Sequence, residues 1–187
     1  MTATSEDNYR RFLEGDQSGF DAIMEEFQQN LLYFLNGYVH NLSTAEDLAM
    51  DTFVEILMHR QRYRFQSSFK TYLFSIARHK AIDYLRREQR RASVTLEQIG
   101  EMSDGLPALE DQIIQTERLQ TLRKGMEGLP DEYREVLYLL YIENLSYDDI
   151  ARVMKKNKKQ IDNLAYRARQ SMRTALGREG IFDEEFS

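Results

Sequence analysis

Residues 146–173, SYDDIARVMKKNKKQIDNLAYRARQSMR, consist of two amphipathic segments with a short polar break between them. Ser146 is suited to cap the first segment. Apolar side chains repeat at helical spacing on both sides of the break at 155–157: Ile150, Val153 and Met154 before it, and Ile161, Leu164, Ala165, Ala168 and Met172 after it. A short helix, a tight turn and a longer helix are typical of a helix-turn-helix.

The outward face of the second segment is polar and cationic, with Lys159, Asn163, Tyr166, Arg167, Gln170 and Arg173. Lys and Arg neutralise phosphates, whereas Asn, Gln and Arg carry the donors and acceptors that read base edges. Any soluble helix has a charged outer face, but residues 152–173 hold eight cations against one acid. This excess favours binding in the major groove of DNA over a merely solvated surface.

Charge is distributed unevenly along the chain. The 187 residues carry 25 Lys and Arg against 31 Asp and Glu, a net charge of −6. Residues 59–91 hold ten of the cations with two acids, and the 132 residues outside 59–91 and 152–173 have a net charge of −21. Two basic segments on an acidic body suggest a polyanion that is bound at two places.

Apolar residues recur at helical spacing along most of the chain, and no stretch alternates as a strand would, so the predicted fold class is all-α. One helix is expected around 20–34. Ser43 with Glu46 forms a capping box, which predicts a second helix through about Met58. A third helix is expected over about 68–91.

Helical periodicity weakens over 92–116, where Ser, Gly and Pro gather with several acids. This composition predicts a flexible acidic linker. We therefore expect two small helical domains, 5–91 and 117–177, of which the second is the helix-turn-helix. The acidic tail, 178–187, is expected to be frayed or dependent on a partner.

The basic segment 59–91 interleaves aromatic with cationic side chains, as in RYRF at 62–65. Exposed aromatic rings beside a cationic track are how proteins hold single-stranded nucleic acid. Aromatic residues at helical spacing are also typical of a core, so Phe69 and Tyr72 are compatible with burial. The run RREQRR at 86–91 indicates phosphate contact.

Asp47, Asp51 and Glu55 follow one another at intervals of four residues in the second predicted helix. This spacing places them along one side of the helix. A solvated face and a docking surface for a basic protein are both compatible with that arrangement. A metal site is discounted, because no histidine lies among the acids and no bend brings their oxygens together.

The composition excludes several classes of protein. There is no Cys, so neither a disulfide, a thiolate zinc site nor a cysteine nucleophile can form. The polar start of the chain is unlike a secretory signal, and no apolar run approaches the roughly 20 residues of a membrane helix. His40, His59 and His79 are scattered, without a nucleophile-base spacing or a phosphate-binding loop. We expect a soluble intracellular protein that is not an enzyme, holds no metal or cofactor and does not insert into membranes.

Taken together, four segments resemble the extracytoplasmic-function sigma factors of bacterial RNA polymerase, in the sigma-70 family. They are AEDLAMDTF at 45–53, SSFKTYLFSIARH with AIDYLRR within 67–87, LPDEYR at 129–134, and LSYDDIA with YRAR within 145–169. The resemblance covers nearly the whole chain except the linker and the tail. It implies an initiation factor of the cytoplasm that binds core RNA polymerase, recognises two promoter elements and melts the DNA.

The resemblance also implies roles for individual residues. Those that would dock the polymerase are Asp47, Met50, Asp51 and Glu55. Those that would contact the melted minus-ten element are Arg62, Tyr63, Arg64, Phe65, Lys70, Arg78, His79, Asp83, Arg86 and Arg87. Those that would contact the duplex minus-thirty-five element are Lys158, Lys159, Asp162, Asn163, Tyr166, Arg167 and Gln170. The acidic linker would thread toward the polymerase active-site channel.

The chain departs from the family pattern at several positions. Tyr72 replaces a usual Trp, and His79 stands where Asn is frequent. Asp162 occupies a position that is often Lys or Arg, and Asp can accept from a cytosine amino group. The residues at 155–159 replace a small turn that usually contains Gly.

A second interpretation is a helix-turn-helix regulator that acts without the polymerase and whose N-terminal domain is a dimerisation or effector module. The aromatic-basic segment and the acidic stripe argue against it, because a dimer interface prefers apolar residues. An anti-sigma factor is a further partner that the family allows.

Overall fold

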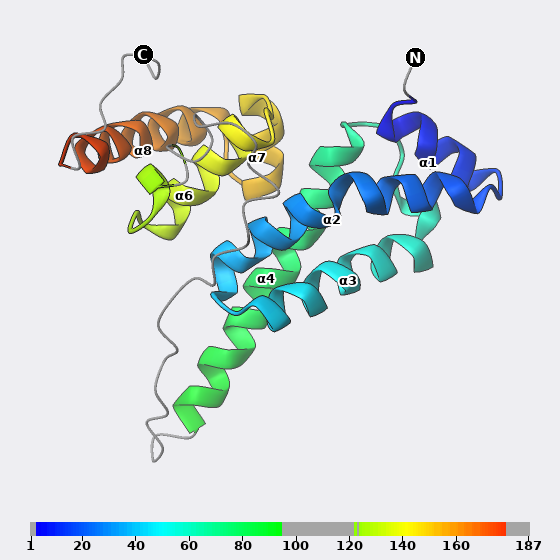
Figure 1. Ribbon diagram of the computed structural model, residues 1–187, viewed down its shortest axis with the longest axis horizontal. Coiled ribbons are helices and arrows are strands. Elements are labelled where there is room, and N and C mark those ends of the chain that lie inside the picture. Colours follow the sequence, from blue (N-terminus) through cyan, green and yellow to red (C-terminus); the bar gives the residue numbers. More distant parts are fainter. Residues whose placement is uncertain (1–2, 95–121, 123, 179–187) are drawn as a thin grey trace. The chain divides into compact units, whose positions relative to one another are not determined.

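The chain forms two compact units, Met1–Ala108 and Leu109–Ser187. The computed structural model describes residues 3–94, 122 and 124–178, and none of these lies in a strand. The predicted all-α class with two helical domains is therefore confirmed (Figure 1). The predicted linker from residue 95 onward, and the predicted tail from 179 onward, lie outside the described residues. Within the described ranges, no helix is both long enough and apolar enough to span a bilayer.

Over residues 3–94, the N-terminal unit contains four α-helices and one short 3₁₀ turn. They are α1 (Ser5–Leu13), α2 (Gln17–Val39), α3 (Leu42–Met58), η1 (Arg60–Arg62) and α4 (Phe69–Val94). The predicted apolar stripe of the helix around 20–34 forms the centre of the core, with Phe20, Ile23, Phe27, Leu31 and Phe34 all buried. Each such large side chain contributes about 1.5–3 kcal/mol by leaving water.

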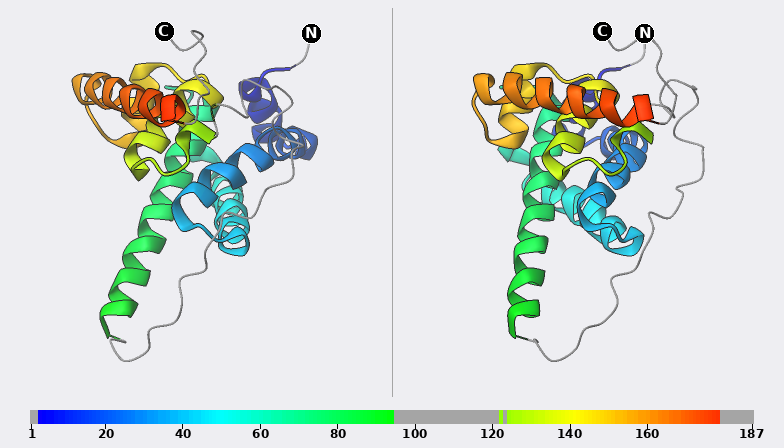
Figure 2. Two further views of the ribbon diagram at one scale, coloured as in Figure 1. Left: turned by 60° about the vertical axis from the view of Figure 1, so that its left-hand side comes forward. Right: turned by 90° about the vertical axis from the view of Figure 1, so that its left-hand side faces the viewer.

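Helix α4 has a buried half and an exposed half. Phe69, Leu73, Phe74, Ala77 and Ala81 are buried in the core. None of residues 82–93 is buried, and the helix extends beyond its neighbours in the N-terminal unit (Figure 2). Ile82 and Leu85 of this part are half-buried, because the helix here runs past the other helices of the unit (Figure 2). The exposed half presents the basic run at 86–91 to solvent.

The start of α3 differs from the prediction. Asn41 is the capping residue, and its Oδ1 accepts from the backbone N–H of Thr44 at 2.9 Å. The predicted capping box of Ser43 and Glu46 is wrong, because the helix begins at Leu42 and Ser43 already lies inside it. His40 adopts the left-handed conformation that ends α2, and Asn41 returns the chain to an extended one.

Gly19 permits a close approach of α1 to α2. A Cβ at this position would collide with the backbone oxygen of Asn8 and lie 2.9 Å from the backbone nitrogen of Phe12.

We expect Gly19→Ala to destabilise the N-terminal unit by about 1–3 kcal/mol through overpacking, although the same change in an open helix stabilises by about 0.5–1 kcal/mol. Urea unfolding beside the exposed-site control Gln17→Ala measures the difference; stabilisation by Gly19→Ala would contradict this packing.

The C-terminal unit contains α6 (Asp131–Leu137), a single π-helical turn η2 (Tyr138–Ile142), α7 (Tyr147–Met154) and α8 (Lys158–Arg178). The apolar face of α7 is buried as predicted. The apolar face of α8 is buried at Ile161, Ala165, Ala168 and Met172, and Leu164 is half-buried. Buried residues before and within α6 complete this core: Leu122, Met126, Leu129, Val136 and Leu137.

Candidate nucleic-acid interface

The turn between α7 and α8 is closed by backbone and capping hydrogen bonds. At the start of α7, the predicted cap by Ser146 is confirmed, since its hydroxyl accepts from the Asp149 N–H at 3.1 Å. Lys155 ends α7 in the left-handed conformation, with φ 53°, and the Lys156 N–H donates to the Ala151 carbonyl at 3.0 Å. A non-glycine residue in this conformation has a cost of roughly 1–2 kcal/mol.

Helix α8 then starts with a reciprocal cap. The Gln160 N–H donates to Asn157 Oδ1, and the Asn157 N–H donates to Gln160 Oε1, both at 2.9 Å. Two backbone donors are thereby satisfied at the start of the helix. The break that replaces the usual Gly-containing turn therefore has a defined geometry that fixes the direction of α8 relative to α7.

The exposed face of α8 holds every residue that the sequence predicts to contact the duplex element. Lys158, Lys159, Asp162, Asn163, Tyr166, Arg167 and Gln170 are all exposed. The buried opposite face sets the rotation of the helix, and Arg169 donates to the Tyr147 hydroxyl at 3.0 Å, which ties α8 to α7. The structure therefore brings these seven side chains together on one helix.

The cations of this surface differ in how far they are neutralised. Lys158 Nζ lies 3.3 Å from Asp148 Oδ1, and Lys156 Nζ lies 2.9 Å from Glu132 Oε1. Within residues 124–178, neither Lys159 nor Arg167 forms an ion pair with an acid. Their charges are therefore available to an incoming polyanion.

The loop between α3 and α4 is anchored by a buried tyrosine. The ring of Tyr63 is 4 % exposed and stacks on Tyr72, with ring centroids 5.0 Å apart. Its hydroxyl donates to the Ser67 carbonyl at 2.7 Å, and burial raises its pKa to about 12. Tyr63 therefore holds the loop in place from inside, and its ring is not on the surface where the sequence predicts a DNA contact.

The tip of the same loop is exposed. Phe65 adopts the left-handed conformation, with φ 56°, and its ring is 37 % exposed. Arg62 and Arg64 are exposed on either side of Tyr63. The loop thus exposes Arg62, Arg64 and Phe65 to solvent, while Tyr63 between the two arginines is buried.

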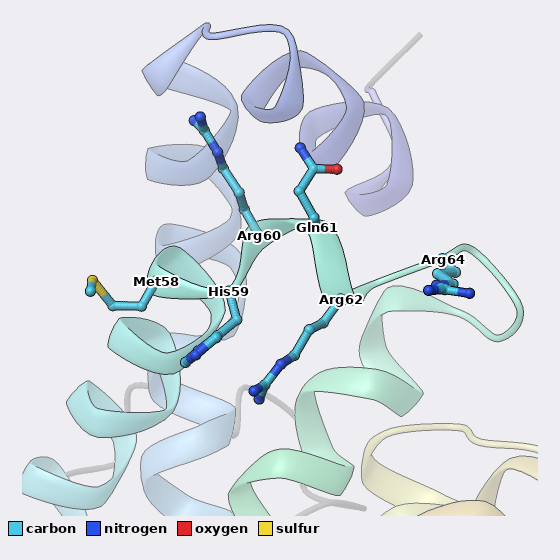
Figure 3. A pocket seen from close by; sticks show the side chains of 6 residues that line it. All are labelled: Met58, His59, Arg60, Gln61, Arg62 and Arg64. Carbon is cyan, nitrogen blue, oxygen red and sulfur yellow. The ribbon is translucent and has the colours of Figure 1, made fainter.

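An open, cationic pocket of about 440 Å³ lies where α3 runs into this loop. It is lined by Met58, His59, Arg60, Gln61, Arg62 and Arg64. Figure 3 shows that Arg60 and Gln61 point to one side of the ribbon, while His59 and Arg62 point to the other. No individual role was predicted from the sequence for 59–61, although Arg60 belongs to the basic segment 59–91.

The remaining predicted minus-ten residues lie along α4. Lys70 and Arg78 are half-buried, whereas His79, Arg86 and Arg87 are exposed. Asp83 lies between two of them, with Oδ2 3.4 Å from His79 Nε2 and Oδ1 3.7 Å from an Arg86 nitrogen. The exposed nitrogens of this face are therefore partly oriented by one carboxylate.

The outer face of α3 combines carboxylates with apolar side chains. Asp47 and Asp51 are exposed beside Met50. The apolar residues of this face are also exposed, with exposed fractions of 53 % for Met50, 45 % for Val54, 39 % for Leu57 and 73 % for Met58. No role was predicted from the sequence for Val54 or Met58, although Met50, Val54 and Met58 recur at intervals of four residues.

Glu55 points away from this face of α3 and toward α4. Its carboxylate accepts from Lys80 Nζ at 2.8 Å and lies 3.7 Å from an Arg62 nitrogen. The hydrogen bond from Lys80 holds the pKa of Glu55 below its ordinary value. Successive residues of an α-helix rotate by about 100°, so Glu55 is turned about 80° from Asp47. The structure thus separates Glu55 from the two aspartates and joins it to α4.

Comparison with known proteins matches both units to family models. Residues 23–91 match "Sigma-70 region 2", and residues 119–172 match "Sigma-70, region 4". The ECF RNA polymerase sigma factor SigM of Bacillus subtilis (strain 168) is 30% identical over 164 residues, 88% of this chain and 98% of that protein. The RNA polymerase sigma-H factor of Pseudomonas aeruginosa is 30% identical over 175 residues, 89% of this chain and 90% of that protein.

Two solved structures share the fold. The sigma factor RpoE from Bartonella quintana, in complex with the anti-sigma factor NepR, matches with a TM-score of 0.69 at 23% identity, covering 84% of this chain and 96% of that one. CnrH, in complex with the cytosolic domain of CnrY, matches with a TM-score of 0.61 at 19% identity, covering 91% and 96%.

Proposed function

This chain belongs to the extracytoplasmic-function sigma factors of the sigma-70 family, and on that premise we propose which of its surfaces carries out each step of initiation. As a sigma factor it binds core RNA polymerase and recognises promoter DNA. We assign polymerase docking and minus-ten recognition to the domain 5–91, and minus-thirty-five recognition to the domain 117–177. Residues 92–116 would connect the two.

The single observation that carries the proposal is the outer face of α3. Exposed apolar side chains gathered on one helix indicate a protein-binding surface, and here Met50, Val54 and Met58 lie beside Asp47 and Asp51. The apolar groups would supply the buried centre of the interface, and the carboxylates would attract a basic partner. We assign this face to core polymerase, without Glu55, which is paired with α4.

The exposed tip of the α3–α4 loop and one face of α4 are assigned to the melted minus-ten strand. Phe65 would stack on an unpaired base, an interaction worth about 1–3 kcal/mol. His79, oriented by Asp83, would contact a base edge. The phosphate contacts are assigned to the exposed arginines around them, Arg62, Arg64, Arg86 and Arg87. Tyr63 is omitted because its ring is buried.

The outer face of α8 is assigned to the duplex minus-thirty-five element. Asn163, Tyr166 and Arg167 would face the bases, and Lys158, Lys159 and Gln170 the backbone. Asp162 would accept from a cytosine amino group. These side chains are on one exposed helix face, as major-groove reading requires.

We further propose that the protein acts in the cytoplasm, as family members act on DNA inside the cell, and that it has no catalytic activity of its own. An anti-sigma factor is proposed as its regulator. The support is that the RpoE structure, which shares this fold, was solved with an anti-sigma factor bound. Such a regulator would compete with polymerase if it covered the outer face of α3.

A comparison of free and polymerase-bound protein tests this function against a regulator that works alone. Free protein is expected to bind promoter duplex only non-specifically, with a Kd of roughly 1 µM or weaker, because residues outside the two basic segments carry a net charge of −21. The complex with core polymerase is expected to bind the same promoter with a Kd of about 10 nM or tighter. Fluorescence anisotropy with promoter and scrambled duplexes measures both; tight specific binding by the free protein would support the regulator.

A further inference from the structure

No residue of helix α1 is named in the assignments above, and the helix lies outside the segment 23–91 that matches sigma-70 region 2. It nevertheless contacts the α3–α4 loop at its start, its tip and its end. We propose that Glu6, Tyr9 and Arg10 of α1 are positioning residues that hold this loop ready for the minus-ten strand. The inference rests on the proposed function, because it assumes that the loop captures melted DNA.

The end of the loop is fixed by Glu6. Its Oε1 accepts from the backbone N–H of Phe69, the first residue of α4, at 2.7 Å. The first N–H groups of a helix have no partner within the helix, so a carboxylate there both satisfies a donor and interacts favourably with the helix dipole. The Ser68 hydroxyl accepts from the Thr71 N–H at 3.1 Å and completes the cap.

The start of the loop is fixed by Tyr9. Its side chain is fully buried, and its hydroxyl donates to the Arg60 carbonyl at 2.8 Å. Its ring meets the edge of Tyr63, with centroids 5.1 Å apart, and lies 5.0 Å from Phe69. One tyrosine of α1 thus links η1, the loop anchor Tyr63 and the first turn of α4.

The tip of the loop is held by Arg10. Its guanidinium carbon lies 4.8 Å from the centre of the Phe65 ring, at cation–π distance. Phe65 also approaches Tyr9 and Tyr63, with centroids 6.2 and 4.6 Å apart. A bulky residue with positive φ persists only where its surroundings hold it, and here two of the three neighbours come from α1.

These contacts matter for function because an ordered loop loses less conformational entropy when it captures a strand. Figure 3 shows the loop beside the α1 ribbon. Glu6, Tyr9 and Arg10 make these contacts with the α3–α4 loop and not with the outer face of α3, so the loss of one contact should leave polymerase docking intact. Such a loss should instead slow promoter opening and weaken the choice among minus-ten bases.

The experiment uses full-length protein assembled with core polymerase, on a promoter that the wild-type complex opens. Glu6→Ala removes the acceptor for Phe69, whereas Glu6→Gln retains a side-chain oxygen and is the rescue variant. Tyr9→Phe removes only the hydroxyl. Arg11→Ala is the matched control for Arg10→Ala, since Arg11 is an exposed neighbour that pairs with Asp16 at 2.7 Å. Each variant is measured for core affinity, opening rate and preference for matched over mismatched minus-ten single strand.

We expect Glu6→Ala, Tyr9→Phe and Arg10→Ala each to slow opening and reduce base preference by about fivefold. A loss of this size is typical of one hydrogen bond, as for Glu6 and Tyr9, and of one cation–π contact, as for Arg10. Core affinity should stay unchanged, and Glu6→Gln and Arg11→Ala should behave as wild type. Wild-type opening and base preference in all variants would overturn the role of α1. Equal losses in core affinity and opening would also overturn it, by reducing α1 to a general structural element. Failure of the wild-type complex to open any promoter would instead reject the proposed function.

Discussion

Reversing the charge of one exposed aspartate, in an Asp51→Arg variant, is expected to weaken binding to core RNA polymerase by about 10- to 100-fold. Asp51 lies on the exposed face of α3 between Met50 and Val54, which are themselves exposed. An arginine there would meet the basic partner surface with like charge. The fold should be preserved, because the side chain at this position does not enter the core.

The measurement is a titration of labelled core polymerase with each variant, together with a thermal melt of the free protein. Asp21→Arg provides a matched control, because Asp21 is an exposed acid on α2 and the change in net charge is the same. The control should keep wild-type affinity. Equal affinity of Asp51→Arg and wild type, with both proteins folded, would remove the docking assignment of α3.

Truncation of Arg167 is expected to weaken promoter binding by the polymerase complex by roughly 1–3 kcal/mol, at one base position of the minus-thirty-five element. Arg167 is exposed on α8, and within 124–178 no acid pairs with it. Its guanidinium is therefore available to make the bidentate contact with guanine that major-groove arginines favour. Arg167→Ala should lose discrimination at that position and keep it elsewhere.

Lys159→Ala is the contrasting variant, because Lys159 is exposed on the same helix and pairs with no acid among residues 124–178, but is assigned to phosphate. It should weaken binding uniformly across sequences and reduce the dependence on salt. Both variants are measured by competition with a set of single-base minus-thirty-five substitutions. A uniform loss for Arg167→Ala would make it a phosphate contact instead of a base reader.

The helix-turn-helix could be predicted in detail because its signals are local. Apolar spacing alone separates the buried from the exposed face of α8, and Ser146 caps α7 in the structure as its position predicts. The start of α3 could not be predicted to the residue, since Asn41 and Ser43 are both good caps. Only the backbone turn at His40 selects Asn41.

The exposure of the α3–α4 loop and the pairing of Glu55 depend on contacts between residues that are distant in the sequence. Tyr63 and Phe65 each follow an arginine, yet Tyr63 is buried against Tyr72 and donates to the Ser67 carbonyl, whereas Phe65 stays 37 % exposed. Glu55 continues the acidic spacing of α3, but Lys80 of α4 captures its carboxylate. Neither outcome has a signal in the local pattern of residues.

As a sigma factor, this chain is expected to direct core RNA polymerase to promoters and to open them there. The most direct measurement is run-off transcription on genomic fragments by purified bacterial core polymerase, with and without the protein. We predict discrete transcripts only when the protein is present, starting downstream of DNA in which permanganate detects unpaired thymines. Transcripts that are identical with and without the protein, and no melting in its presence, would rule out this function.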